Sequence, residues 1–284
     1  MTEFLDADGL PPEDGSPESA LRRVVALMAK LRAPQGGCPW DREQTFDTIA
    51  PYTLEEAYEV ADAIARRDTS ALREELGDLL FQVVFHSRLA EEQGSFDLAA
   101  VACGLVEKMI RRHPHVFGTA EARDAAQQSM HWEQQKAAEK VSAGHPSVLD
   151  DIPVAMPSLM RAAKLGRRVS RVGFDWPDAE GARAKIDEEL GELAAAVSVG
   201  RREEIAAELG DVLFAVVNLA RHLGVDPEEA LRGTNRRFEQ RFRRLESLLA
   251  AEGLTPAEAG LERMDEAWNE AKRELAGGGR QESD

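Results

Sequence analysis

The chain has 284 residues, of which 52 are acidic and 35 are basic, and its formal net charge is −17 at pH 7. Such an acidic protein is a poor partner for nucleic acid or for an anionic membrane. The apolar runs are shorter than the ~20 residues that a transmembrane helix needs, and the acidic N-terminus is unlike a basic signal peptide. Because Cys38 and Cys103 are the only cysteines, we expect no disulfide framework and a cytoplasmic protein.

The two ends of the chain differ in composition from the rest. Residues 1–17 contain three prolines among acids and glycines, without an apolar period, so we expect a disordered arm there. Residues 276–284 are polar and rich in glycine, and we expect a disordered tail. Between them, Ala, Leu, Glu and Arg are frequent and the apolar residues recur with helical spacing, which predicts an all-α fold.

The middle of the chain contains an internal repeat. Residues 53–88 align without a gap with residues 186–221, at an offset of 133, and 14 of the 36 aligned positions are identical. This similarity indicates a tandem duplication of one helical unit. We expect the units to span residues 18–145 and 146–275, with a boundary in the loop-like stretch at 143–153.

Each unit is predicted to begin with an amphipathic helix that carries the pattern EExxE, at residues 53–67 and 184–199. Thr53 is the expected N-cap of the first of these helices. After a short turn, an apolar helix is predicted at residues 72–94 and again at 205–224. A third helix is expected to start near Asp97 or Pro227 and to end in basic residues.

Acidic residues occupy corresponding positions on the first two helices of each unit. Residues three and four apart lie on one helix face, and helices joined by a short turn pack antiparallel, so four carboxylates per unit are expected to converge. They are Glu56, Glu59, Glu75 and Asp78 in the first unit and Glu189, Glu192, Glu208 and Asp211 in the second. Solvated helix faces are the simple alternative, but the acids keep their register although the turn between the helices differs. Because converging acids repel unless a cation lies among them, the pattern indicates a metal site.

The type of ligand indicates which metal is bound. A di-iron bundle would use Glu-x-x-His pairs, whereas here an acid stands at the histidine position. Oxygen ligands select hard cations, and Mg²⁺ usually combines a few carboxylates with phosphate oxygens of a substrate. We therefore expect Mg²⁺, or Mn²⁺ in its place, and a substrate that carries phosphates.

A phosphate-bearing substrate also needs positive charge. The third helices carry basic pairs at i, i+4, Lys108 with Arg112 and Arg237 with Arg241, which are candidates for binding phosphates. The alternative is that they only complement the dipole at a helix C-terminus. Neither GxxxxGK[ST] nor GxGxxG after a strand is present, so a nucleotide would not be bound as in P-loop or Rossmann proteins.

Several motifs together resemble one known family. They are CPWD at 38–41, PYTLEEAYEVADAI at 51–64, ELGDLLFQVVFH at 75–86, RRHPHVFG at 111–118, VGFDWPD at 172–178 and ELGDVLFAVVNLARHLG at 208–224. In this order they resemble the MazG family of nucleoside triphosphate pyrophosphohydrolases, and the resemblance covers residues 18–275.

The resemblance implies a fold and an activity. The fold would be all-α, with tandem MazG-type units and a four-helix-bundle active-site core completed by dimerisation, so that the protein is a homodimer. The activity would be metal-dependent hydrolysis of NTPs and dNTPs at the α–β linkage to the monophosphate and pyrophosphate, with broad base specificity, in nucleotide-pool house-cleaning.

The resemblance also implies roles for individual residues. The eight acids named above would be metal ligands, and Arg237 and Arg241 would contact phosphates. For the general base we expect Glu188 or Glu189, whichever is left free of metal. The runner-up hypothesis is a helical nucleotide-binding or regulatory module that binds its ligand without turnover, above all in the first unit.

Overall fold

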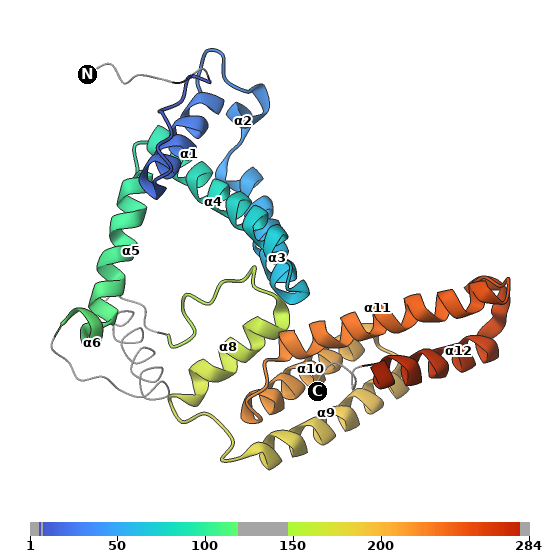
Figure 1. The fold of residues 1–284 in the computed structure, drawn as a ribbon. Helices are drawn as coiled ribbons and strands as arrows, with labels where there is room; N and C mark the ends of the chain where they lie inside the picture. The colour runs from blue at the N-terminus through green and yellow to red at the C-terminus, as the bar shows by residue number, and fades with distance from the viewer. Residues whose placement is uncertain (1–5, 7, 119–146, 279–284) are drawn as a thin grey trace. The chain divides into compact units, whose positions relative to one another are not determined.

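The computed structural model describes residues 6, 8–118 and 147–278. Figure 1 shows helices joined by loops, and the described residues contain no strand, which confirms the predicted all-α fold. Contacts along the chain divide it into two compact units, residues 1–135 and 136–284. No helix in the described ranges is long and apolar enough to cross a lipid bilayer.

Three of the predicted segments fall partly outside this range. The predicted boundary stretch at 143–153 is described only from residue 147, and the predicted tail at 276–284 only up to residue 278. Of the predicted arm at 1–17, residue 6 and residues 8–17 are described, and α1 (Pro17–Leu31) begins at its end.

The first unit is built around an antiparallel helix pair, α3 (Phe46–Arg66) and α4 (Thr69–Glu92), which pack along one another (Figure 1). The turn between them is short because Arg67 adopts a left-handed conformation with a φ of 56°. The Asp68 side chain then caps α4 by accepting from the backbone N–H groups of Ser70 and Ala71. α1 packs on α4, and the unit also contains α2 (Pro39–Glu43), α5 (Leu98–Arg112) and α6 (Pro114–Phe117).

α3 begins earlier in the chain than predicted. Its N-cap is Thr45, whose side chain accepts from the backbone N–H of Thr48, so the predicted N-cap at Thr53 is wrong. Pro51 lies inside this helix and removes one backbone hydrogen bond. The first turns form nevertheless because Ile49, only 1% exposed, packs in the core of the unit. Burial of this side chain and the Thr45 cap offset the local cost of the proline in part.

The second unit repeats this plan with the pair α9 (Ala179–Val199) and α10 (Arg202–His222). Asp178 caps α9, and Gly200, with a φ of 81°, makes the left-handed turn toward α10. α8 (Ser158–Ser170) packs on α10, whereas α11 (Pro227–Ala251) packs mainly on α12 (Pro256–Gly278). Leu245 and Leu249 are buried in a separate core between α11 and α12.

The loop before α9 is held against the end of α10. The Asp175 carboxylate accepts from Arg221 Nη1 at 2.8 Å and lies 3.0 Å from His222 Nε2. The Arg221 guanidinium holds the pKa of Asp175 below its ordinary value, mainly through these hydrogen bonds. Next to this loop, the Trp176 ring leaves no space for a Cβ at Gly181 in α9. These contacts determine where α9 starts relative to α10.

Candidate active sites

Three acids of the first unit meet between α3 and α4. Glu56 comes from α3, and Glu75 and Asp78 come from the N-terminal half of α4. Each offers one carboxylate oxygen, and the three oxygens lie within 4.8 Å of one another. We call this group the first acid cluster. It forms because the antiparallel pairing sets the middle of α3 beside the start of α4, where the i, i+3 spacing puts both α4 acids on one face.

The second unit contains the matching group, Glu189 from α9 with Glu208 and Asp211 from α10. Their carboxylate oxygens also lie within 4.8 Å of one another. This second acid cluster occupies the positions that the repeat predicts, at an offset of 133 residues. Glu189 is buried, Glu208 is half-buried and Asp211 is exposed, so the cluster opens to solvent on the Asp211 side.

The carboxylates of a cluster disfavour one another's charge. Desolvation, followed by the charges of Asp78 and Glu59, raises the pKa of Glu56 above its ordinary value. Desolvation and the charges of the same two neighbours also raise the pKa of Glu75. In the second acid cluster, desolvation and neighbouring carboxylates raise the pKa of Glu208. A cation held among these oxygens would remove the repulsion.

The fourth acid predicted for each unit borders the cluster instead of belonging to it. Glu59 and Glu192 are exposed and lie one helical turn after the glutamate that α3 or α9 contributes. Their charges still reach the clusters: Glu192 has the largest charge effect on Glu208, and Glu59 has the largest on Glu75.

A lysine that the sequence pattern did not single out lies beside the second acid cluster. Lys185 Nζ lies 2.7 Å from Glu189 Oε1 and 2.8 Å from Glu188 Oε1. Hydrogen bonds to these two carboxylates raise the pKa of Lys185, which keeps it charged. Its position four residues before Glu189, on the same helix face, is the signal that identifies it in the sequence. The repeat places Tyr52 at the corresponding position of the first unit.

The first acid cluster has uncharged polar neighbours instead. Gln82, which is only 7% exposed, donates from Nε2 to Glu56 Oε1 at 3.5 Å. Further along the same helix pair, Thr53 Oγ1 and His86 Nε2 lie 2.9 Å apart, and the Phe46 ring stacks on His86. The second unit has apolar residues at the positions of Thr53, Gln82 and His86, namely Ile186, Ala215 and Leu219.

The two residues predicted to serve as general base are placed differently. Glu189 belongs to the second acid cluster, and its side chain is 8% exposed. Glu188 lies outside the cluster, with a side chain that is 57% exposed, and shares Lys185 with its neighbour.

The predicted phosphate-binding residues lie on other helices. Arg237 and Arg241 belong to α11, where Arg237 donates to Thr234 Oγ1 at 2.8 Å. Lys108 and Arg112 belong to α5, which contacts α4 and α6. Among the described residues, no ion pair joins any of these four cations to an acid cluster. In the described residues these basic pairs are thus not in direct ion-pair contact with the acids.

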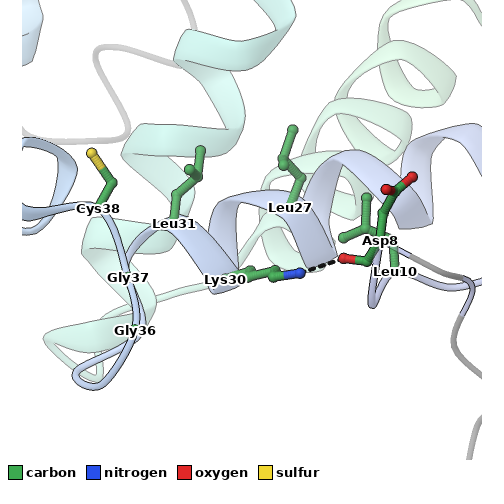
Figure 2. A pocket seen from close by; sticks show the side chains of 8 residues that line it. All are labelled: Asp8, Leu10, Leu27, Lys30, Leu31, Gly36, Gly37 and Cys38. Atoms are coloured by element: carbon green, nitrogen blue, oxygen red, sulfur yellow. Dashed lines mark hydrogen bonds between the residues drawn. The ribbon is translucent and has the colours of Figure 1, made fainter.

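A pocket in the first unit lies apart from these residues. Figure 2 shows it between α1, the loop at 36–38 and the turn at 8–10, with Cys38 at one end. At the other end Lys30 Nζ donates to the carbonyl oxygen of Asp8. No member of either acid cluster lines this pocket, so it is separate from the candidate active sites.

Comparison with known proteins agrees with this geometry. The MazG nucleotide pyrophosphohydrolase domain matches residues 44–117 and 179–245, which contain both acid clusters. A nucleoside triphosphate pyrophosphohydrolase of Escherichia coli K12 is 48% identical over 254 residues, which are 89% of this chain and 97% of the relative. The nucleoside triphosphate pyrophosphohydrolase/pyrophosphatase MazG of Thermotoga maritima is 45% identical over 249 residues, which are 88% of this chain and 94% of the relative.

A more partial match is the nucleoside triphosphate pyrophosphohydrolase of Mycobacterium tuberculosis, 42% identical over 153 residues, which are 53% of this chain and 45% of the relative. The domain match occurs twice, on the two helix pairs that carry the acids. Together with the high identity along almost the whole length of two relatives, this shows that the chain belongs to the MazG family.

Proposed function

We propose that this protein is a nucleoside triphosphate pyrophosphohydrolase, which splits NTPs and dNTPs at the α–β linkage into the monophosphate and pyrophosphate. One observation carries the proposal: each acid cluster lies inside a segment that matches the MazG domain. We assign the hydrolysis to the second unit, residues 146–275, and treat residues 18–145 as a related unit. Base specificity would be broad, since the clusters would act on the phosphates that all nucleotides share. The reaction would remove unwanted nucleotides from the cytoplasmic pool, a house-cleaning role.

Mg²⁺, or Mn²⁺ in its place, fits the donors of the clusters. All of the donors are carboxylate oxygens, the ligands that hard divalent cations prefer. In the second unit Glu189, Glu208 and Asp211 would hold the cation, with Glu192 at the border. The cation, when bound, would polarise the phosphate linkage and lower the pKa of a water. The corresponding residues of the first unit are Glu56, Glu75, Asp78 and Glu59.

The protein's own acid takes the proton of the attacking water. A carboxylate that is not a metal ligand is free for this role; Glu188 meets this condition when Glu189 holds the cation, and Glu189 meets it only when the cation is held without it. Glu188→Gln and Glu189→Gln distinguish them. A variant that lacks the general base should lose turnover but keep Mn²⁺ binding, whereas a variant that lacks a metal ligand should lose both. Electron paramagnetic resonance of Mn²⁺ supplies the binding measurement.

The leaving pyrophosphate needs cations beside the acid clusters. Arg237 and Arg241 would neutralise the charge that builds on the leaving group, and Lys108 with Arg112 are the counterparts in the first unit. Because α11 packs mainly on α12, we expect a second copy of the chain to complete the arrangement.

Exposed apolar side chains support a homodimer. Both helix pairs carry several large apolar residues that are at least 40% exposed, whereas exposed apolar residues on a monomer are normally scattered singly. Among them are Leu54, Tyr58, Leu76, Leu80 and Val83 on α3 and α4, and Leu190, Leu209, Leu213, Phe214 and Val216 on α9 and α10. Pairing of two such faces would create four-helix bundles around the acids. Light scattering on the full chain tests the dimer, and a monomer at micromolar concentration would contradict it.

Product analysis tests the activity. The full chain is incubated with each NTP and Mg²⁺, and the products are identified by chromatography. Monophosphate with pyrophosphate is expected, and EDTA should abolish it. Diphosphate with inorganic phosphate would mean a different phosphohydrolase. Nucleotide binding without any product would favour the alternative, a binding or regulatory module without turnover, for which the uncharged surroundings of the first acid cluster make residues 18–145 the better candidate.

A further inference from the structure

We propose that the two acid clusters differ in their affinity for a divalent cation: the first unit holds a resident cation without nucleotide, with Gln82 as an additional oxygen partner, whereas the second unit binds its cation weakly until substrate is present. This inference rests on the proposed function insofar as both clusters are cation sites. It adds an order of binding and assigns a role to residues of the first unit that the hydrolysis does not use.

The Gln82 side chain provides the observation that points to a ligand. Its Nε2 donates to Glu56, but its Oε1 is buried and has no hydrogen-bond partner. An unsatisfied buried acceptor costs free energy comparable to a lost hydrogen bond. The amide lies against Glu56 of the first acid cluster, and a turn of this side chain toward a cation among the acids would give Oε1 a partner in the cation or its water. In the second unit the corresponding residue, Ala215, offers no such acceptor.

The charged neighbours of the two clusters also favour tighter cation binding in the first unit. Lys185 forms an ion pair with Glu189 and thereby competes with any cation for that carboxylate. Tyr52, the counterpart of Lys185, has no charge and instead packs its ring edge-to-face on Trp40, with ring centroids 6.0 Å apart.

In the described part of the first unit, no cation takes the place of Lys185. Within the described residues, no ion pair is formed by Glu56, Glu75 or Asp78. The Arg66 guanidinium is paired with Asp62 at 2.7 Å and forms no ion pair with the cluster. No cation of the described residues therefore competes with a metal ion for the carboxylates of the first acid cluster, which favours a resident cation.

Mn²⁺ titration of the full chain without nucleotide tests this difference, with bound and free ion distinguished by electron paramagnetic resonance. We expect one tight and one weak site per chain, with dissociation constants that differ by about tenfold or more. Tyr52→Lys, which copies the second unit, should weaken the tight site by about tenfold, and Tyr52→Leu should not. Lys185→Met should tighten the weak site.

Gln82→Ala and Ala215→Gln form a second exchange between the units. Gln82→Ala should weaken the tight site, and Ala215→Gln should strengthen the weak one. If the buried Gln82→Ala variant does not fold, as judged by circular dichroism, Tyr52→Lys gives the answer alone because Tyr52 is 40% exposed.

Three results would overturn the inference. Two equal sites would do so, as would a tight site that Tyr52→Lys leaves unchanged, or a tight site that is lost in Glu208→Gln and kept in Glu75→Gln. In each case hydrolysis could proceed as proposed, so only the inference would fail. If no Mn²⁺ binds with or without nucleotide, the metal-dependent function fails together with it.

Discussion

The helix pairs α3–α4 and α9–α10 hold three acids at matching positions of the repeat, but their neighbours differ in charge and polarity. In the first unit, the neutral amide of Gln82 contacts Glu56, and the Thr53–His86 pair lies further along the same helices. In the second, Lys185 places a positive charge against the buried Glu189. The comparison shows that the duplicated units share the acids and differ in the groups around them. Similar acid clusters can therefore serve one site that turns substrate over and one that retains a cation.

The largest expected effect assigns turnover to one of the two units. Glu208→Gln removes a ligand of the second acid cluster and should lower pyrophosphate release by about 10³-fold, within the range that loss of one stabilising group causes. The matched variant Glu75→Gln should cost less than about tenfold, because the first unit contributes cation binding but no turnover. Glu192→Ala should likewise lower pyrophosphate release more than Glu59→Ala does. An inactive Glu75→Gln beside an active Glu208→Gln would reverse the assignment, and similar losses in both would mean two working sites.

The basic residues of α11 should show the next largest effect. Arg241→Ala and Arg237→Ala should each lower turnover by about 10²-fold, because they remove charge that stabilises the leaving pyrophosphate. Arg243→Ala on the same helix is the control, since its side chain is 77% exposed and pairs with Glu239. Steady-state rates of pyrophosphate release give the comparison. Equal rates for Arg241→Ala and Arg243→Ala would mean that Arg241 of α11 does not contribute to turnover.

Cation binding should also appear in thermal stability. Mg²⁺ at about 100 times its dissociation constant should stabilise the folded chain by about 2.7 kcal/mol per site, provided that it binds only the folded state. In metal-free protein, Asp78→Asn and Asp211→Asn should each raise Tm because they relieve repulsion in a cluster. Each variant should also lose part of the Mg²⁺ effect. Calorimetry with and without EDTA measures this, and a Tm that neither variant nor cation changes would mean that the acids only face solvent.

The metal-free protein should respond to pH through the same acids. The pKa values of Glu56, Glu75 and Glu208 are raised in the folded state. Groups of this kind destabilise the fold when charged, so stability is lost as pH rises from their ordinary pKa through the raised value. Lowering the pH from 7 toward 5 should therefore increase the Tm in EDTA, and saturating Mg²⁺ should diminish this dependence. A Tm in EDTA that falls as the pH is lowered from 7 toward 5 would contradict repulsion among these acids.

The smallest expected effect concerns the loop that precedes α9. Asp175→Asn weakens its bonds to Arg221 and should cost about 2 kcal/mol of unfolding free energy, as for hydrogen bonds to charged groups. Because the folded-state pKa of Asp175 is lowered, its contribution is present above the unfolded value and is lost as pH falls through the folded one. Urea unfolding at pH 7 and pH 3 checks both statements. In the first unit, Arg88 occupies the repeat position of Arg221 and pairs with Glu91 and Glu92 on its own helix, so Arg88→Ala should cost less.

Several features of the site could be predicted from residue spacing alone. The acids of both clusters were identified because i, i+3 pairs on helices joined by a short turn must face one another. Lys185 was missed although its i, i+4 spacing to Glu189 is visible, because basic residues on helices are common and its partner is not distinctive. Gln82 could not have been selected, since its significance depends on burial beside Glu56.

The sequence by itself determined the helical class, the repeat, its register and the oxygen-only character of the clusters, because these depend on periodicity and residue type along the chain. Only the tertiary structure decided where α3 begins: Ile49 is buried in the core, and the helix extends back to Phe46 although Pro51 lies inside it. It also placed Glu59 and Glu192 at the borders of the clusters and left Gln82 Oε1 without a partner. Contacts of this kind join residues that are distant in the chain, and their free energies depend on burial, which no local pattern specifies.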